Sequence, residues 1–554
     1  MNKKVCSFPI LFALLALLIG TCAVVFPASA QAAPTSTGSI TVSGTVARSY
    51  DAYQIFSANV VDGDGDAKIA TDLAWAGDAA RDAALPVLHS AGMPKSQTTA
   101  QEAAEWLNTD SHLTSALSAQ LARSLQSSDA ESVALNAGTT AELSRGYWLI
   151  VADDATISQD EAGTAPIMAL VGGSAVTVKP KAATPKVQKH VLEDSTAAWQ
   201  KAADATVADD LYWRLSATVP AGLTAYDAYT VRFVDTMSVG LDPSKVAASM
   251  RVYVAAGADG GFDAVSTGKD GRAGTEPAKG WTDITAQCGV SVDGKTFTVR
   301  TGDLIAALGG ADAFTAGARV VAVYNAPLNS ACNHGIAKGN PNEVYLRYPR
   351  SPLADQSGDA SFTRTPSDDA CAYTWDLALT KRGSDGDKPL AGAVLSIADD
   401  RGRTLAADGT WDAEGKATVT TGEDGRVTVS GVDSGKLEVR ELKAPKGYTA
   451  FEGTRSVTVK AEGLDVDQVA AAKPKLTITA ESPLRADGAD GSTGSLEASL
   501  INTPAGTPPG ITTGGFMPST GDMAMYAAAA AAVAGAALIV VALLVKRGGG
   551  SHKE

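Results

Sequence analysis

The stretch Tyr373-Thr-Trp-Asp-Leu-Ala-Leu-Thr-Lys381 alternates large apolar residues with smaller or polar ones. Successive side chains of a β-strand point to opposite faces, so one face of this stretch collects Tyr373, Trp375, Leu377, Leu379 and Lys381. A face this apolar packs into a protein core. The pattern therefore predicts a strand that carries one ionisable group, Lys381, inward with its apolar neighbours.

Two later stretches repeat this pattern. One shares a face among Leu437, Val439 and Glu441, and the other among Leu496, Ala498, Leu500 and Asn502. By the same strand parity, each brings one carboxyl or amide group inward. The alternative for each residue alone is that its strand ends there and the polar tip reaches water. Taken together, Lys381, Glu441 and Asn502 are predicted to form a buried cluster.

An earlier region contains a second set of the same residue types. The shared faces are Val187, Lys189 and Val191; then Val231, Phe233 and Asp235; then Asn342, Val344, Leu346 and Tyr348. Asn340 also has inward parity, and Lys186 lies close in sequence. Strand parity favours Lys189 over Lys186 as the inward amine.

We predict a mainly β chain of tandem immunoglobulin-like β-sandwiches, because short apolar strands recur between Gly/Asp turns in residues 182–350 and 371–505. Residues 351–370, rich in Pro, Ser and Asp, are predicted to be a linker. Residues 33–181 are predicted to be an α+β domain, with a helical insertion from Ala67 to Ser127. Asp62–Asp66 lacks the glycine and glutamate positions of a calcium loop, so we expect a turn there and no metal.

Both ends of the chain carry export features. Residues 1–30 read as a signal peptide, with an apolar run after Lys3 and Lys4 and a small-residue cleavage site; cleavage after Ala30 or Ala32 is equally compatible. A spacer at 506–516 leads to Met517-Pro-Ser-Thr-Gly521 and an apolar run at 526–545. Twenty helical residues span about 30 Å, which is the thickness of a bilayer core. The basic tail 546–554 is therefore expected to be cytoplasmic and the rest of the chain outside.

Charge and cysteine content narrow the possible functions. The net charge of −15 and pI of about 4.9 argue against nucleic-acid binding, which requires basic patches. Three cysteines remain after signal removal: Cys288, Cys332 and Cys371. One disulfide is permitted outside the cell, and an odd count leaves at least one sulfur over. We expect no cofactor.

The C-terminal pattern resembles the cell-wall sorting signal of Gram-positive surface proteins, Leu-Pro-x-Thr-Gly, with Met517 in place of the leucine and with Pro518, Ser519, Thr520 and Gly521 following. The resemblance implies that a sortase cleaves after Thr520 and joins its carbonyl to an amine. Val176-Thr-Val-Lys-Pro-Lys181 resembles the pilin motif of sortase-polymerised shafts. The acceptor lysine maps to Lys181, and Lys179 stands as the alternative.

The two buried clusters also resemble known modules. Leu379-Thr-Lys381, Leu437-Glu-Val-Arg-Glu-Leu-Lys-Ala-Pro-Lys-Gly-Tyr448 and Ile501-Asn-Thr-Pro504 are similar to collagen-adhesin B-type (CnaB-like) domains. The resemblance implies a self-made isopeptide bond between Lys381 and Asn502, with Glu441 as catalytic acid. Residues 182–350 look like the isopeptide-forming, CnaA-like middle domain of fimbrial backbone subunits. That implies a Lys189–Asn342 bond with Asp235 as acid, and the family pattern favours Asn342 over Asn340.

Residue chemistry suits this reaction, because burial lowers a lysine pKa and raises a carboxyl pKa until both groups are neutral. A neutral amine is a nucleophile, and a neutral acid can polarise the amide and move its proton. Each chain would react once at each cluster, so we predict no enzyme with turnover.

Together these features predict the backbone subunit of a covalent pilus. A class C pilus sortase would join Thr520 of one copy to Lys181 of the next, and a housekeeping sortase would attach the base to peptidoglycan. Expected partners are identical subunits, with minor or tip pilins possible. The alternative is a wall-anchored adhesin or minor pilin that does not use Lys181. A surface enzyme would need an active site in the first domain, whose histidines are His89 and His112.

Overall fold

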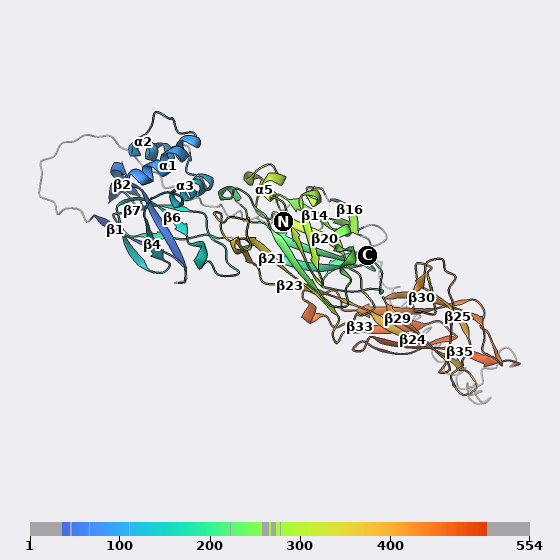
Figure 1. Ribbon diagram of the computed structural model, residues 1–554. Helices are drawn as coiled ribbons and strands as arrows, with labels where there is room; N and C mark the ends of the chain where they lie inside the picture. Colours follow the sequence, from blue (N-terminus) through green and yellow to red (C-terminus); the bar gives the residue numbers. More distant parts are fainter. Residues whose placement is uncertain are drawn as a thin grey trace, which may run out of the picture.

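The computed structural model describes residues 36–506, with gaps at 45–46, 66, 110, 183, 222, 258–264, 268–272 and 278. Three β-rich modules follow one another along an elongated molecule, coloured blue, green to yellow, and orange (Figure 1). The predicted mainly β class, with an α+β first module, is confirmed. The predicted signal peptide, sorting motif, membrane span and tail lie outside the described residues. Within the described part, no helix is long and apolar enough to cross a membrane.

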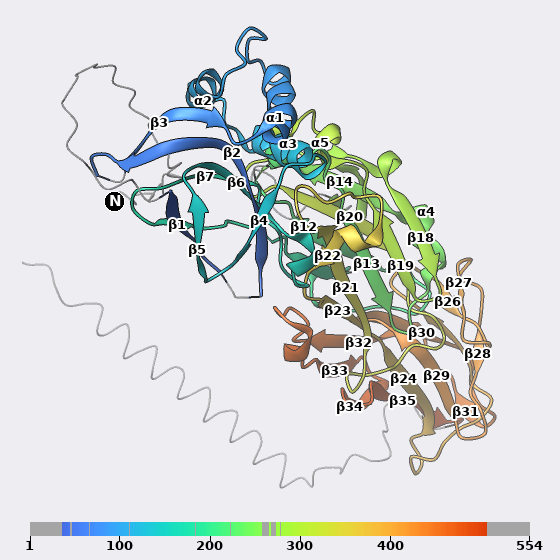
Figure 2. The ribbon, with the colours of Figure 1, turned by 60° about the vertical axis from the view of Figure 1, so that its left-hand side comes forward.

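The first module packs three helices and two sheets in layers. Its elements are β1 Thr37–Val42, β2 Ser49–Asp62, β3 Lys68–Trp75, α1 Asp78–Ser90, α2 Ala100–Asn108, α3 Ser115–Gln126, β4 Ser132–Asn136, β5 Thr140–Ser144, β6 Gly146–Ala152, β7 Ile167–Val171 and β8 Val176–Val178. The helices cover one face of the sheet β3-β2-β6-β7 (Figure 2), and the sheet β5-β1-β8 packs on the other. Thr99 and Thr114 cap α2 and α3 by accepting backbone N–H bonds.

The helical prediction from Ala67 to Trp75 is wrong. Residues Lys68–Trp75 form strand β3, which pairs antiparallel with β2. A turn closed by the bond from Gly63 N–H to the Ala67 carbonyl reverses the chain, so the long strand β2 offers a ready ladder partner. Leu73 and Trp75 then pack toward the helical core with the two-residue period of a strand. Composition alone misled here, because tertiary pairing overrides weak local propensity.

The second module is a sandwich of two sheets. One sheet contains β10 Ala198–Gln200, β9 Val187–Glu193, β12 Tyr212–Thr218, β20 Arg319–Asn325, β14 Arg251–Ala255 and β17 Thr282–Asp283, in that order. The facing sheet contains β11 Ala202–Asp204, β23 Asp368–Tyr373, β21 Asn340–Pro349, β13 Arg232–Met237, β19 Thr296–Arg300 and β18 Gly289–Asp293, with β22 Phe362–Arg364 beside β21. The space between the sheets is filled by a continuous apolar core. A separate two-stranded sheet, β15 Val265–Thr267 and β16 Ala273–Pro277, completes the module, which also carries the short helices α4 Val246–Ser249 and α5 Leu304–Ala307.

The third module is a second sandwich. One sheet contains β29 Arg426–Val432, β24 Trp375–Gly383, β35 Ser495–Pro504 and β31 Tyr448–Thr449, with β34 Leu484–Asp490 beside β35. The other contains β27 Trp411–Asp412, β26 Thr404–Leu405, β25 Val394–Ala398, β30 Gly435–Lys443, β32 Thr454–Glu462 and β33 Lys475–Ala480, with β28 Val419–Thr420 beside β25. Strands β24 and β35, the first and last of the module, are parallel neighbours.

The predicted linker 351–370 is largely structured. It contains β22 and the start of β23, which pairs antiparallel with β21 and parallel with β11. Side chains of β23 alternate between two cores: Ala370 and Ala372 belong to the core of the second module, while Cys371 and Tyr373 belong to that of the third. The two modules therefore share a strand, and the boundary falls at Thr374 instead of residue 371. Polar composition hid the start of this strand because Asp368 and Asp369 open it.

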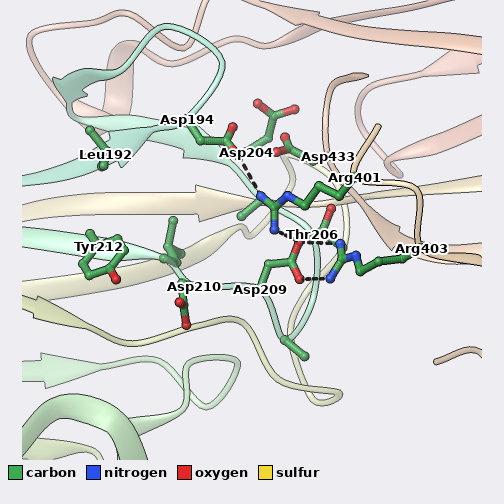
Figure 3. A pocket seen from close by; sticks show the side chains of 13 residues that line it. Leu192, Asp194, Asp204, Thr206, Asp209, Asp210, Tyr212, Arg401, Arg403 and Asp433 are labelled. Atoms are coloured by element: carbon green, nitrogen blue, oxygen red, sulfur yellow. Dashed lines mark hydrogen bonds and ion pairs between the residues drawn. The ribbon is translucent and has the colours of Figure 1, made fainter. Parts of the chain in front are cut away.

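A charged pocket of about 560 Å³ lies beside this shared strand (Figure 3). Arg403 of the third module holds Asp209 of the second with two bonds of 2.5 and 2.8 Å, and Arg401 adds a third at 2.8 Å. Burial raises the pKa of Glu193 to about 8 and that of Asp433 well above its usual range. Both arginines already have carboxylate partners within the pocket. We infer that these ion pairs hold the second and third modules together.

Several hydrogen bonds and an ion pair connect the first and second modules. Arg123 donates to Asp227 and to the Pro352 carbonyl, both at 3.0 Å, and Ser351 donates to Asp154 at 2.8 Å. The extended residues after β8 connect the two modules covalently and contain Lys179 and Lys181, both exposed.

Candidate functional site

The second-module cluster gathers one residue from each of three strands. Lys189 lies on β9, whereas Asp235 and Asn342 lie on the adjacent strands β13 and β21 of the facing sheet. All three side chains are completely buried. The apolar residues that alternate with them along each strand fill the module core, and this alternation holds the three polar groups in the space between the sheets.

A tyrosine hydroxyl connects the three groups. Lys189 Nζ donates to Asp235 Oδ2 and, at 2.9 Å, to the hydroxyl of Tyr324. That hydroxyl donates to Asp235 Oδ2 at 3.0 Å and accepts from Asn342 Nδ2 at 2.8 Å. The sequence reasoning missed Tyr324. The signal was present in β20, where Val320, Ala322 and Tyr324 share the inward face.

Aromatic rings surround the amine of Lys189. Its Nζ lies 5.4 Å from the ring centroids of both Trp213 and Tyr324, and the ring of Phe297 meets that of Tyr324 edge-on at 4.7 Å. These rings are fully or almost fully buried. Such walls exclude the water that would otherwise compete as a nucleophile or solvate a charged amine.

Burial drives both titratable groups toward neutrality. Burial lowers the pKa of Lys189 to about 8, although the nearby Asp235 carboxylate opposes the shift. Burial likewise raises the pKa of Asp235, against the opposing effect of Lys189. Among the described residues, Asp235 Oδ1 and Asn342 Oδ1 are buried without a hydrogen-bond partner. A proton on Asp235 Oδ1 would supply a donor where two acceptors are otherwise unsatisfied.

The third-module cluster has a different layout. Lys381 on β24 and Asn502 on β35 lie on neighbouring parallel strands, and Glu441 reaches them from β30 of the facing sheet. Lys381 Nζ donates directly to Asn502 Oδ1 and lies 3.2 Å from Glu441 Oε1. Asn502 Nδ2 donates to both carboxyl oxygens of Glu441, at 2.9 and 3.0 Å. The amine, the amide and the acid are therefore in mutual contact.

Burial is again the dominant electrostatic effect. It lowers the pKa of Lys381 to about 8, with Glu441 opposing the shift. Glu441 Oε2 also accepts the backbone N–H of Phe451 at 3.1 Å, which fixes the carboxyl orientation. The exposed fractions are 0% for Lys381, 6% for Glu441 and 2% for Asn502, so solvent reaches none of them freely.

The alternative candidates Lys186 and Asn340 lie outside the two clusters. Lys186 is exposed. Asn340 is buried, but its amide is satisfied by the backbone of Asn333 and by the Ala372 carbonyl. In the first module, His89 Nε2 lies 2.9 Å from the Gln97 carbonyl, and His112 Nδ1 lies 2.7 Å from that of Trp106. Both histidines thus have structural partners.

Two further sequence expectations concern cysteines and metals. Cys288, Cys332 and Cys371 are all free thiols in the structure. Within the described residues, no group of three or more His, Cys, Asp or Glu side chains is arranged to hold a metal ion.

Comparison with known proteins finds a family match within the third module. Residues 376–473 match the family model described as SpaA, prealbumin-like fold domain. This part of the third module is therefore similar to SpaA-type prealbumin-like domains. A curated relative, the trypsin-resistant surface T6 protein of Streptococcus pyogenes serotype M6, is 29% identical over 143 residues. That match covers 24% of this chain and 24% of the relative, so the chain spans about a quarter of that protein's length.

Solved structures give weaker likenesses over more of the chain. The T6 backbone pilin of serotype M6 Streptococcus pyogenes is 17% identical with a TM-score of 0.45, covering 86% of this chain and 100% of that one. The full-length major pilin SpaD from Corynebacterium diphtheriae is 15% identical with a TM-score of 0.40, covering 85% and 97%. The family match falls in the part of the chain whose motifs resemble the CnaB-like domains of Gram-positive surface proteins.

Proposed function

We propose that this chain is the backbone subunit of a covalent pilus on a Gram-positive cell surface, polymerised by a sortase from Thr520 to Lys181. The observation that carries the proposal is the third-module cluster, in which a buried amine, amide and carboxyl touch one another on the module's first and last strands and the facing sheet. Such a cluster suits a chain that must withstand pulling at its ends.

The position of Lys181 supports a shaft role. It is exposed at the boundary of the first and second modules, whereas β35 leads toward Thr520 from the third module at the other end of the molecule (Figure 1). Tension between Lys181 and Thr520 would run through the second and third modules and bypass the first. Both lysine clusters lie on this loaded path.

The proposed intramolecular chemistry is a single condensation at each cluster. Neutral Lys Nζ attacks the side-chain carbonyl carbon of Asn, and the carboxylic acid donates a proton to the developing oxyanion. The C–N bond of the amide then breaks, the acid returns the amine proton to the leaving nitrogen, and ammonia departs. An isopeptide bond remains and no cofactor is consumed.

The cross-links would stabilise the modules strongly. Lys381 and Asn502 are 121 residues apart in sequence. By analogy with a disulfide that closes a loop of this size, each bond would stabilise its module by up to about 5 kcal/mol. Pulling would then load a covalent bond in place of a ladder of hydrogen bonds.

Two acceptor variants test polymerisation in cells that carry the pilus sortase. Lys181→Ala should abolish the ladder of covalent multimers in wall extracts, while Lys179→Ala, the matched control two residues away, should leave it intact. Loss of the ladder in Lys179→Ala alone would move the junction to Lys179. A ladder that survives both changes would overturn the assignment of Lys181 as the acceptor.

The same extracts separate the alternative, a wall-anchored adhesin or minor pilin. Thr520→Ala removes the threonine side chain from the sorting motif that the sortase would recognise, so it should abolish both multimers and wall attachment. A chain that needs Thr520 for wall attachment but forms no multimers in any variant would be the adhesin or minor pilin.

A further inference from the structure

The loop between β20 and β21 holds a second set of reactive residue types, outside both lysine clusters. Cys332 Sγ lies 3.5 Å from His334 Nε2, and His334 Nδ1 lies 2.8 Å from Asp376 Oδ1. Cys332 and His334 belong to the second module, whereas Asp376 lies on β24 of the third. The three side chains thus form a continuous thiol–imidazole–carboxylate chain across the shared joint.

Asp376 is well fixed to orient the imidazole. Its Oδ1 also accepts from the Ser430 hydroxyl at 2.6 Å and from Gly431 N–H at 3.0 Å. Burial would raise the pKa of Asp376, but the bonds from His334, Ser430 and Gly431 hold it below the ordinary value. The carboxylate is therefore a permanent acceptor that keeps a proton on His334 Nδ1 and turns Nε2 toward the sulfur.

The loop that carries the other two residues is tied to both modules. Gly335 N–H donates to the Thr374 carbonyl at 3.1 Å, and Ile336 N–H donates to the Gly491 carbonyl at 3.1 Å. Gly335 also packs so closely on Gly494 that a side chain would not fit between them. Backbone contacts thus hold this loop of the second module against the third.

We propose that Cys332, His334 and Asp376 form a thiolate–imidazolium site in which the Cys332 sulfur attacks low-molecular-weight disulfides. An imidazolium beside a cysteine favours the thiolate, which is the nucleophilic form. Hydrogen bonds that the His334 ring donates to Asp376 and Cys332 raise its pKa to about 10, so its charge persists at neutral pH. Cys332 is buried, with 9% of its surface exposed, and the side chain of His334 beside it is 25% exposed.

Thiol–disulfide exchange fits this site better than acyl transfer. An acyl intermediate needs free donors for its oxyanion. Here the N–H groups of Ala331, Cys332 and Asn333 already donate to Asn329 and Asn340. Exchange develops no oxyanion. It also suits the extracellular setting, where disulfides persist, and to that extent the inference depends on the surface location in the proposed function.

The exchange step balances without another reactant. The Cys332 thiolate attacks one sulfur of R–S–S–R, the disulfide bond breaks, and R–S⁻ leaves with the bonding electron pair. The departing thiolate takes a proton from water, Cys332 is oxidised to a mixed disulfide, and half of the reagent is reduced to a thiol. The Cys332 sulfur carries no charge in the mixed disulfide, so Asp376 remains as the charged partner of His334.

The chain contains its own reference thiols. Burial raises the pKa of Cys288 to about 11, and that of Cys371 also to about 11, and neither sulfur has an imidazole partner. Cys288 is the more exposed of the two. If accessibility alone governed reaction, Cys288 would react first; if the neighbouring imidazolium governs it, Cys332 would.

The test uses oxidised glutathione and the whole mature chain. Peptide mass spectrometry would follow glutathione at each cysteine between pH 5 and 9. We expect Cys332 to react at least about tenfold faster than Cys288 and Cys371 at pH 6–7, because an imidazole lies beside its sulfur whereas burial disfavours the thiolate of the other two. His334→Gln should slow Cys332 about tenfold at pH 6–7, with the difference shrinking toward pH 9. Asp376→Asn should act in the same direction.

His112→Gln, in the first module, is the matched control and should leave all three rates unchanged. The proposal is overturned if Cys332 reacts no faster than Cys288 across this pH range, or if folded His334→Gln keeps the wild-type pH profile. If His334→Gln fails to fold, the wild-type ranking of the three thiols decides. Failure of the Lys181 experiment would not alter this ranking, so the two proposals can be separated.

Discussion

The two lysine clusters use the same residue types in two different topologies. In the second module the amine and the amide lie on facing sheets, and the acid is on the strand next to the amide. In the third module the amine and the amide lie on neighbouring parallel strands, and the acid comes from the facing sheet. A tyrosine hydroxyl mediates the first arrangement, whereas the second needs only direct contacts.

This difference shows what the chemistry requires. Both sites bury an amine, an amide and a carboxyl in one hydrogen-bonded cluster, and the two clusters use different strand orders. The mechanical results differ. A Lys189–Asn342 bond would tie the two sheets of a sandwich together, while a Lys381–Asn502 bond would tie the first strand of a module to the last, side by side. The proposed bonds therefore resist separation of sheets in one module and sliding of strands in the other.

Removing either amine should have the largest effect. Wild-type mature chain is expected to fall short of its sequence mass by one ammonia for each of two bonds. Lys189→Ala and Lys381→Ala should each restore one ammonia and lower the free energy of unfolding of their own module by up to about 5 kcal/mol. Intact-mass spectrometry and thermal unfolding would measure both effects.

Exposed lysines provide controls for the Lys189→Ala and Lys381→Ala variants. Lys186→Ala in the second module and Lys388→Ala in the third remove side chains that reach solvent, so both deficits should persist. Asp235→Asn and Glu441→Gln should abolish one deficit each while leaving the amine and amide in place. A wild-type mass equal to the sequence mass, or deficits unaffected by Lys381→Ala, would contradict the clusters' proposed role.

Removing the tyrosine hydroxyl should distinguish the two sites. Tyr324→Phe deletes the group that contacts Lys189, Asp235 and Asn342 while keeping the ring. A hydrogen bond to a charged group is worth about 1.5–3 kcal/mol, so the second-module bond should form about 10–100 times more slowly. Time-resolved peptide mass spectrometry after a pulse of synthesis would measure it, with the Lys381–Asn502 bond in the same molecule as reference. Equal slowing of both bonds would indicate a general folding defect.

A smaller effect is expected in the pH dependence of the free energy of unfolding of a variant that cannot form the Lys189–Asn342 bond. Asn342→Ala leaves Lys189 as a free amine with a pKa of about 8, below that of a lysine in an unfolded chain, about 10.4. Between these values the unfolded state binds more protons, so raising the pH should favour the folded state, by at most about 1.4 kcal/mol per pH unit. Denaturant unfolding at pH 8, 9 and 10 would measure the slope. Adding Lys189→Met should remove it; a slope that persists would assign it to another group.

Strand parity predicted a large part of this structure. The period of two was sufficient to predict that Lys189, Asp235, Asn342, Lys381, Glu441 and Asn502 point inward, because alternation depends only on local geometry. Parity does not determine which strands become neighbours. It therefore could not predict the parallel pairing of β24 with β35 or the placement of Lys189 opposite Asp235. Tyr324 was missed for the same reason, since its importance depends on what it faces. β3 and β23 were misjudged because long-range pairing decides their structure.

Strand β23, with its side chains divided between two cores, has a consequence for shape. Changing the angle between the second and third modules would peel either Ala370 and Ala372 or Cys371 and Tyr373 away from apolar surroundings and into water. The pair should therefore turn as one stiff body. In the proposed fibre, the axial repeat and the helical twist per subunit would then be set by the dimensions of this body and by the single covalent junction at its ends, so bending would concentrate at the junctions between subunits.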